Sequence, residues 1–335
     1  MLAEPRDLSV ETVLSGVCAG WDPAVTWAEH LPVGASAHHW QAGAEAGPRW
    51  FVTADAMADA DNARRRACCY AAAAQLSAVL DFVLAPAPGL RGETTTPLPP
   101  SYLLSVAPYV EGQPVGELAT GPARGTFADD AARADVASML ARLHTARRPA
   151  GIPTWQPRIG WRSSVRRQQL DAVRRATPWD TGPLAHPAWQ VVTGAAPLLD
   201  RATRRFDLLA AAASGSIAAW VPTHGEPHAG NVLATSGGPR LVDWATLAVA
   251  PPERDLRHVL PDAEGSDPEL AYLASGGAPR VMSEDLLELF ALESHLAEVA
   301  DAAATFAAPH DGGPDDERSL EQLDTELAAL SARWG

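Results

Sequence analysis

The chain has 335 residues, of which 47% are hydrophobic, so it can form one large or two smaller packed domains and is not a disordered protein. Its formal net charge of -15 argues against a nucleic-acid partner, which would need basic patches; it favours solubility and would also suit a cationic small molecule. No apolar run is long enough to cross a membrane, no secretory signal is visible, and the three cysteines form no disulfide or zinc pattern, so we expect a cytoplasmic protein without a membrane partner.

The first third of the chain is rich in predicted strands. A short helix is expected at 8–19, and a long Ala-rich helix at 59–84. The segment 86–100 is rich in Pro, Gly and Thr and is predicted to be a loop. Strands are expected at 25–29, 39–42, 49–53 and 102–108.

The remainder of the chain is predicted to be mainly helical. A short β segment at 219–244, with a turn at Ser236-Gly-Gly238, interrupts the helices. We see no internal repeat. Helices are expected at 127–145, 162–176, 187–213, 286–304 and 319–332.

Three polar side chains in the β segment have an order that suits phosphoryl transfer. That reaction needs a carboxylate to orient the attacking hydroxyl, an Asn a few residues later to bind Mg²⁺, and a second carboxylate on the metal. Glu226, Asn231 and Asp243 have this order and spacing, and the turn at 236–238 would bring the last two together. We therefore take them as the candidate catalytic residues, with Asn231 and Asp243 as the metal ligands.

The segments His224-Gly-Glu-Pro-His-Ala-Gly-Asn231, Val242-Asp-Trp244 and Glu253-Arg-Asp-Leu256 resemble the aminoglycoside phosphotransferase family, which is related to choline kinases and protein kinases. The ending Pro251-Pro-Glu-Arg-Asp255 resembles the spectinomycin-type branch of that family. The resemblance implies an α+β, two-lobed, protein-kinase-like fold. Its small β-rich N-lobe would span 1–107 and bind the nucleotide, and its larger helical C-lobe would span 108–335.

The resemblance also implies roles for single residues. Asp255 would be a structural Asp that hydrogen-bonds the catalytic loop, and His224 would orient that loop. The backbone around Val106, Tyr109 and Val110 would meet the base of ATP or GTP. Arg64 could reach the nucleotide phosphates, although Arg64, Arg65 and Arg66 could equally form a solvated helix surface.

Two departures from the family pattern stand out. Glu226 occupies the place of the catalytic Asp, and its extra methylene moves the carboxylate by roughly an ångström. The chain contains no lysine, so the usual strand Lys is missing, and its expected position is Thr53. The helix at 59–84 carries no Glu, so the positive charge and its carboxylate partner are expected to be missing together.

Two other interpretations stay open. His224, Glu226 and His228 alternate along the chain and could form a metal cluster. Val33-Gly-Ala-Ser36 could be a phosphate-covering loop or an ordinary turn.

For the whole protein, we expect a phosphotransferase that uses Mg²⁺ and ATP or GTP to phosphorylate a hydroxyl of a small molecule. An aminoglycoside or an aminocyclitol antibiotic would fit, which would make the protein an antibiotic-resistance enzyme, and so would a biosynthetic intermediate. The alternative is a catalytically silent kinase-fold protein that binds a nucleotide or small molecule without turnover. The sequence does not predict the oligomeric state.

Overall fold

The structure is a computed structural model that describes residues 1–34, 37–57, 59–116, 126–158, 170–171, 178–213, 219–260, 265–279 and 282–335. The chain forms two compact units. The first contains residues 1–118, 125–155 and 221–279, and the second contains 119–124, 156–220 and 280–335. The expected lobe boundary at residue 107 therefore falls inside the first unit.

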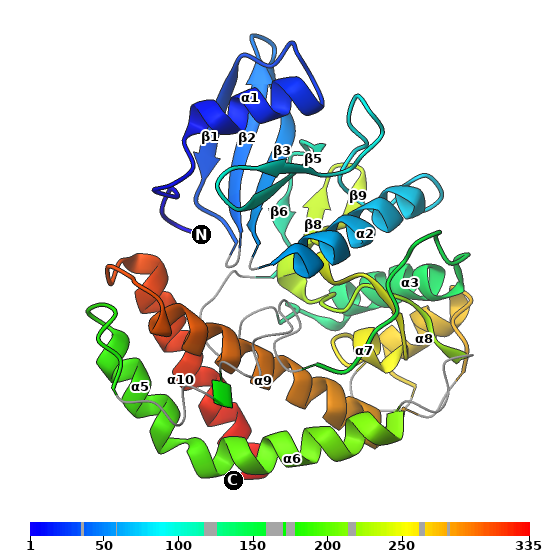
Figure 1. Ribbon diagram of the computed structural model, residues 1–335. Helices are drawn as coiled ribbons and strands as arrows, with labels where there is room; N and C mark the ends of the chain where they lie inside the picture. The colour runs from blue at the N-terminus through cyan, green and yellow to red at the C-terminus, as the bar shows by residue number, and fades with distance from the viewer. Residues whose placement is uncertain are drawn as a thin grey trace. The chain divides into compact units, whose positions relative to one another are not determined.

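An antiparallel five-stranded sheet in the order β1-β2-β3-β5-β4 forms the N-terminal part of the first unit. Helix α1, Val10–Gly20, covers one face of this sheet (Figure 1). Val13 and Val17 on α1 are buried against Trp40 and Leu104 of the sheet, because an amphipathic helix buries its apolar face. The strands are β1 (Trp27–Leu31), β2 (His38–Ala44), β3 (Gly47–Ala56), β4 (Thr96–Leu98) and β5 (Tyr102–Pro108).

Helix α2, Ala60–Ser77, is shorter than the helix predicted at 59–84. Its N-terminus is capped by Asp59, whose side chain accepts a hydrogen bond from the Asn62 amide. The apolar residues beyond Ser77 pack onto β9 instead: the Leu241 amide donates to the Phe82 carbonyl and the Leu84 amide donates to the Leu241 carbonyl. Their hydrophobic pattern reflects this contact and not a helix.

The rest of the first unit contains short strands and helices around the predicted β segment. Helix α3, Asp130–Thr145, packs on α8, Asp267–Ala274. Strand β6 (Gln113–Pro114) joins β8 (Val232–Thr235) and β9 (Gly238–Leu241) in one sheet, and β7 (Val221–Thr223) pairs with β10 (Ala248–Ala250). The turns and helices between them are η2 (Ala229–Asn231), η3 (Trp244–Thr246) and α7 (Glu253–Leu256).

The second unit is helical over its described residues. Helix α9, Glu284–Ala307, packs against α10 (Pro314–Trp334), α6 (Ala196–Ala213) and α5 (Ala185–Gly194). The predicted helix at 187–213 is thus two helices, divided at Gly194 and Ala195. The predicted helix at 162–176 lies outside the described residues except for 170–171.

These observations confirm the α+β class: antiparallel strands dominate the N-terminal region and helices the C-terminal region. None of the helices in the described part of the chain has the length and apolar character needed to span a bilayer.

Candidate active site

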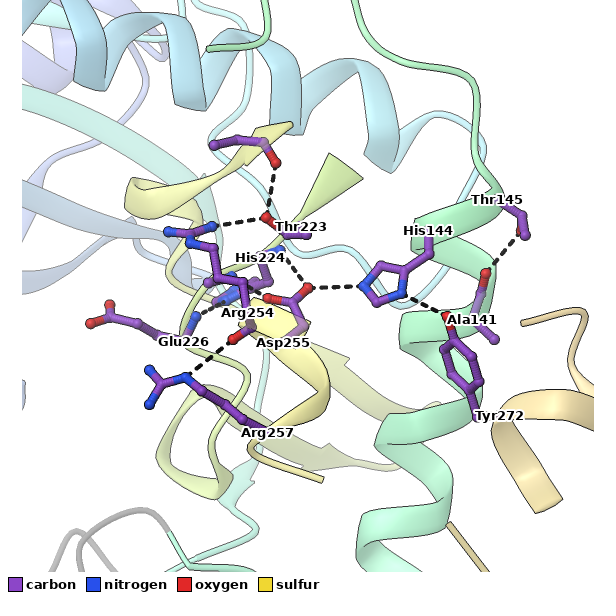
Figure 2. Close-up of polar contacts among 12 residues, drawn as sticks. Ala141, His144, Thr145, Thr223, His224, Glu226, Arg254, Asp255, Arg257 and Tyr272 are labelled. Atoms are coloured by element: carbon purple, nitrogen blue, oxygen red, sulfur yellow. Dashed lines mark hydrogen bonds and ion pairs between the residues drawn. The ribbon is translucent and has the colours of Figure 1, made fainter. Parts of the chain in front are cut away.

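The carboxylate of Asp255, on α7, holds the loop that follows β7. Its Oδ2 accepts the His224 amide at 2.8 Å and its Oδ1 accepts the Gly225 amide at 2.6 Å. His144 at the end of α3 places its Nε2 3.2 Å from Asp255 Oδ2, and its Nδ1 lies 3.0 Å from the Tyr272 hydroxyl (Figure 2). Asp255 is therefore the buried anchor of the loop.

Two opposing effects act on the pKa of Asp255. Burial raises the pKa, but the hydrogen bond from His144 and the charge of Arg254 outweigh it, so the pKa lies below its usual range. Asp255 is ionised at neutral pH and can accept all three hydrogen bonds.

The imidazole of His224 joins the loop to the strand that leads into Asp243. Its Nε2 donates to the Val242 carbonyl at 2.8 Å, and its Nδ1 accepts the Glu226 amide at 3.2 Å. Burial lowers the pKa of His224, so the ring is neutral and can donate at one nitrogen and accept at the other. The position of Glu226 is thereby tied to the backbone one residue before Asp243.

Gly225 is required at its position for two reasons. Its φ is +101°, and a Cβ there would lie 2.2 Å from Arg254 Nη2. The buried Arg254 guanidinium donates to Thr223 Oγ1 at 2.9 Å and to the Thr246 carbonyl at 3.0 Å, so it has little freedom to move.

The hairpin predicted at 236–238 forms and brings Asn231 next to the Asp243 segment. Val232 pairs with Leu241, and the Val242 amide donates to the Asn231 carbonyl at 3.0 Å. The Asn231 side chain donates from Nδ2 to the Glu226 carbonyl at 2.9 Å. This bond uses the amide nitrogen, so the amide oxygen is the Asn231 side-chain atom that could bind a cation.

Asp243 has an unusual backbone conformation. Among the described residues, it is the one non-glycine residue with a positive φ, at φ 59° and ψ 70°. Such a conformation costs about 1–3 kcal/mol and tends to occur at functional sites. The side chain is exposed, and its Oδ1 accepts the Ala245 amide at 3.4 Å.

The donor set of Asn231 and Asp243 fits Mg²⁺, which prefers oxygen ligands and retains several waters. The described residues contain no group of three His, Cys, Asp or Glu side chains that could hold a metal. The alternative cluster of His224, Glu226 and His228 therefore finds no support, since both ring nitrogens of His224 already bond the protein.

A second buried network joins β3 to α2. Arg66 Nη1 lies 2.7 Å from Asp55 Oδ1, and the Tyr70 hydroxyl donates to Asp55 Oδ2 at 2.8 Å. Thr53, the expected Lys position, instead has its hydroxyl 3.1 Å from Nδ1 of His39, and burial lowers the pKa of His39 to about 4. The usual strand Lys and helix Glu are both absent, as expected, and the strand instead carries a carboxylate that pairs with a helix cation.

The predicted nucleotide residues lie at different places in the first unit. Val106 is buried in β5 and its carbonyl accepts the Ala87 amide at 2.7 Å, while the Tyr109 amide donates to the Arg49 carbonyl at 2.8 Å. Val110 is half-buried. The Arg64 side chain is 71% exposed and pairs with Asp61 on the same helix, so it lies on the surface.

Sequence reasoning missed the residues that brace this site. His144, Tyr272, Arg254 and Thr246 are far from the loop in sequence, and their roles come from buried hydrogen bonds. The Asp55–Arg66 pair was not predicted because it contains neither the Lys nor the Glu of the family pattern. A buried Asp on an apolar strand is the signal that could have found it.

Comparison with known proteins places these observations in a wider context. Residues 27–289 match the family described as "Phosphotransferase enzyme family". Protein StrN of Streptomyces griseus is 31% identical over 255 residues, which cover 72% of this chain and 70% of StrN.

Solved structures of similar fold are phosphotransferases. Spectinomycin phosphotransferase in complex with ADP and spectinomycin has a TM-score of 0.65 at 14% identity, covering 97% of this chain and 98% of that one. Amicoumacin kinase hAmiN, in complex with AMP-PNP, Ca²⁺ and Ami, has a TM-score of 0.55 at 13% identity, covering 97% of this chain and 94% of that one. The likeness confirms the protein-kinase-like fold.

Proposed function

This chain belongs to the phosphotransferase enzyme family, and from that premise we propose that it transfers the γ-phosphate of a nucleotide to a hydroxyl of a small molecule. One observation carries the proposal: Glu226, Asn231 and the residue before Asp243 are linked by direct hydrogen bonds through His224 and the β8–β9 hairpin.

Glu226 is proposed to orient the attacking hydroxyl and to accept its proton. Its backbone is held on both sides, because its amide donates to His224 and its carbonyl accepts from Asn231. Its half-buried side chain extends away from the Asp255 network in Figure 2. Because two hydrogen bonds fix the Glu226 backbone, the carboxylate has a defined position, which proton transfer requires.

Asn231 and Asp243 are proposed to hold Mg²⁺. The ion would neutralise charge on the nucleotide phosphates. The protein's part is to present the two oxygens: the bond from Asn231 Nδ2 to Glu226 fixes the amide, and the Asp243 side chain is exposed on a residue with left-handed backbone conformation.

The nucleotide base is proposed to bind at the end of β5. Since the Val106 carbonyl and the Tyr109 amide are already bonded within the protein, the Tyr109 carbonyl and the Val110 backbone are the better candidates for contact with the base of ATP or GTP. Arg64 is too exposed to be assigned a phosphate contact from its position alone.

The proposed substrate is a hydroxylated, cationic small molecule. The net charge of -15 favours a cation, and the structural relatives include phosphotransferases bound to spectinomycin and to kanamycin. An aminocyclitol is the first choice, because the spectinomycin enzyme has the higher TM-score of the two.

The test is calorimetry with Mg·ATP and Mg·GTP, followed by mass spectrometry of aminocyclitols and aminoglycosides incubated with protein and nucleotide. We expect nucleotide binding and a phosphorylated product. Failure to bind either nucleotide at millimolar concentration would overturn the proposal. Binding without a product on the panel, together with normal binding in Glu226→Gln, would instead favour the silent binding protein.

A further inference from the structure

The ion pair between Asp55 and Arg66 is nearly inaccessible to solvent. The Asp55 side chain is 3% exposed and the Arg66 side chain 11%, and their charged atoms lie 2.7 Å apart. A buried ion pair is weak evidence for stability, because the cost of desolvating both charges can exceed their attraction. A functional role would account for its presence.

Helix α2 places this pair beside the Asp243 segment. The helix packs against η3, which begins immediately after Asp243, and the Cys69 thiol donates to the Leu247 carbonyl at 3.3 Å. Burial lowers the pKa of Arg66, but the charges of Asp55 and Asp243 and the hydrogen bond with the Tyr70 hydroxyl outweigh this and hold the pKa above its usual value. The guanidinium is therefore charged at neutral pH, and the charge of Asp243, the proposed metal ligand, acts on it.

The hydrogen bonds of Arg66 leave part of its guanidinium available. Its contacts with Asp55 and with the Tyr70 hydroxyl, at 2.7 and 3.3 Å, both use Nη1. Neither bond uses Nε or Nη2, so within the described part of the chain these two nitrogens are not engaged by Asp55 or Tyr70. A guanidinium presents a planar fork of donors that suits phosphate oxygens, and Nε and Nη2 are the part of that fork that Asp55 and Tyr70 leave unused.

In protein kinases the phosphate-binding cation is a Lys on the third strand, paired with a Glu on the following helix. Here the strand carries the carboxylate and the helix carries the cation. We propose that Arg66 binds the nucleotide phosphates and that Asp55 and Tyr70 hold its guanidinium in place, so the pair acts with its charges exchanged between strand and helix. This inference rests on the proposed function, because it assumes that a nucleotide binds.

The test uses the whole chain and begins with calorimetry of the unaltered protein with Mg·ATP and Mg·GTP. For the nucleotide that binds, the affinities of the corresponding nucleoside diphosphate and of the nucleoside are then measured for Arg66→Gln and compared with those of the unaltered protein. We expect diphosphate affinity to fall about ten- to hundredfold, as for loss of a hydrogen bond to a charged group, and nucleoside affinity to change less than twofold. Arg91→Gln removes the same charge from an exposed loop position and should leave both affinities unchanged.

Because Arg66→Gln leaves Asp55 buried without its cation, the double variant Asp55→Asn/Arg66→Gln provides a neutral pair that can fold. It should lose diphosphate affinity to the same extent. Unchanged diphosphate affinity, an equal loss of nucleoside affinity, or a larger loss in Arg64→Ala would each overturn the role of Arg66 and leave the proposed function standing. If the unaltered protein bound neither nucleotide, the proposed function would fail and this inference with it.

Discussion

The amide of His224 donates to the carboxylate of Asp255 at 2.8 Å, and this contact ties the start of the catalytic loop to a helix thirty-one residues later in the chain. The same carboxylate accepts from Gly225 and from His144, so three separate donors depend on it.

Asp255→Ala should destabilise the protein by about 3–5 kcal/mol, because it leaves buried amide and imidazole donors without an acceptor. Urea unfolding measures the loss. Asp61→Ala removes a carboxylate that is 79% exposed and should cost less than about 1 kcal/mol. Similar losses in the two variants would show that Asp255 is not the anchor.

Gly225→Ala should be far more harmful than Gly238→Ala. Both glycines have a positive φ, +101° and +95°, but only at Gly225 would a Cβ meet Arg254, whereas nothing lies within 4 Å at Gly238. We expect about 1–2 kcal/mol of destabilisation at Gly238 from backbone strain, and several kcal/mol at Gly225, where the clash adds to it. Thermal unfolding of the two variants compares strain alone with strain plus clash.

Glu226→Gln should reduce kcat by about 10²–10⁴-fold with little change in nucleotide affinity, because it removes the base and keeps the backbone hydrogen bonds. Glu226→Asp should also be impaired, by on the order of a hundredfold, since the shorter side chain withdraws the carboxylate by about an ångström. Steady-state kinetics decides both cases. Full activity in Glu226→Gln would exclude Glu226 as the base.

Asp243→Asn should fold normally and lose metal-dependent activity. Asn tolerates the left-handed backbone that Asp243 adopts, so the substitution removes charge without adding strain. Addition of Mg²⁺ and nucleotide should raise the melting temperature of the unaltered protein and leave that of the variant unchanged. An equal shift in both proteins would place the metal elsewhere.

Stability should fall as the pH drops below about 6.5, where histidines of the unfolded chain take up protons. Burial lowers the pKa of His224, and burial together with the Arg257 charge lowers the pKa of His258 well below its usual value. Both rings stay neutral in the folded protein, so their contribution is complete above pH 6.5 and is lost on acidification.

We expect each of these histidines to contribute a slope of about 1.4 kcal/mol per pH unit in that range. Urea midpoints measured between pH 7.5 and 5 would show it, and His258→Asn should make the slope shallower. A slope unaffected by this substitution would assign the pH dependence to other groups.

Local patterns predicted the parts of the fold that depend on neighbours in sequence. Strand β5 occupies residues 102–108 as predicted, and the Ser236-Gly-Gly238 turn forms the hairpin beside Asn231. The resemblance of the loop at 224–231 identified the family correctly.

Features set by contacts distant in sequence were not predictable in the same way. The strand β4 was missed because Pro97 lies in its middle, which only an edge strand tolerates. The extra length assigned to α2 came from apolar residues that pack on Leu241. His144 and Arg254 are recognisable as parts of the site only once the chain has folded around Asp255.

The buried ion pair of Asp55 and Arg66 also constrains which substitutions these two positions can accept. Changing either member alone to the other sign would bury two like charges at 2.7 Å, which a marginally stable domain does not tolerate. A change of charge at one of these positions therefore requires a compensating change at the other. In sequences related to this one, positions 55 and 66 should consequently vary together.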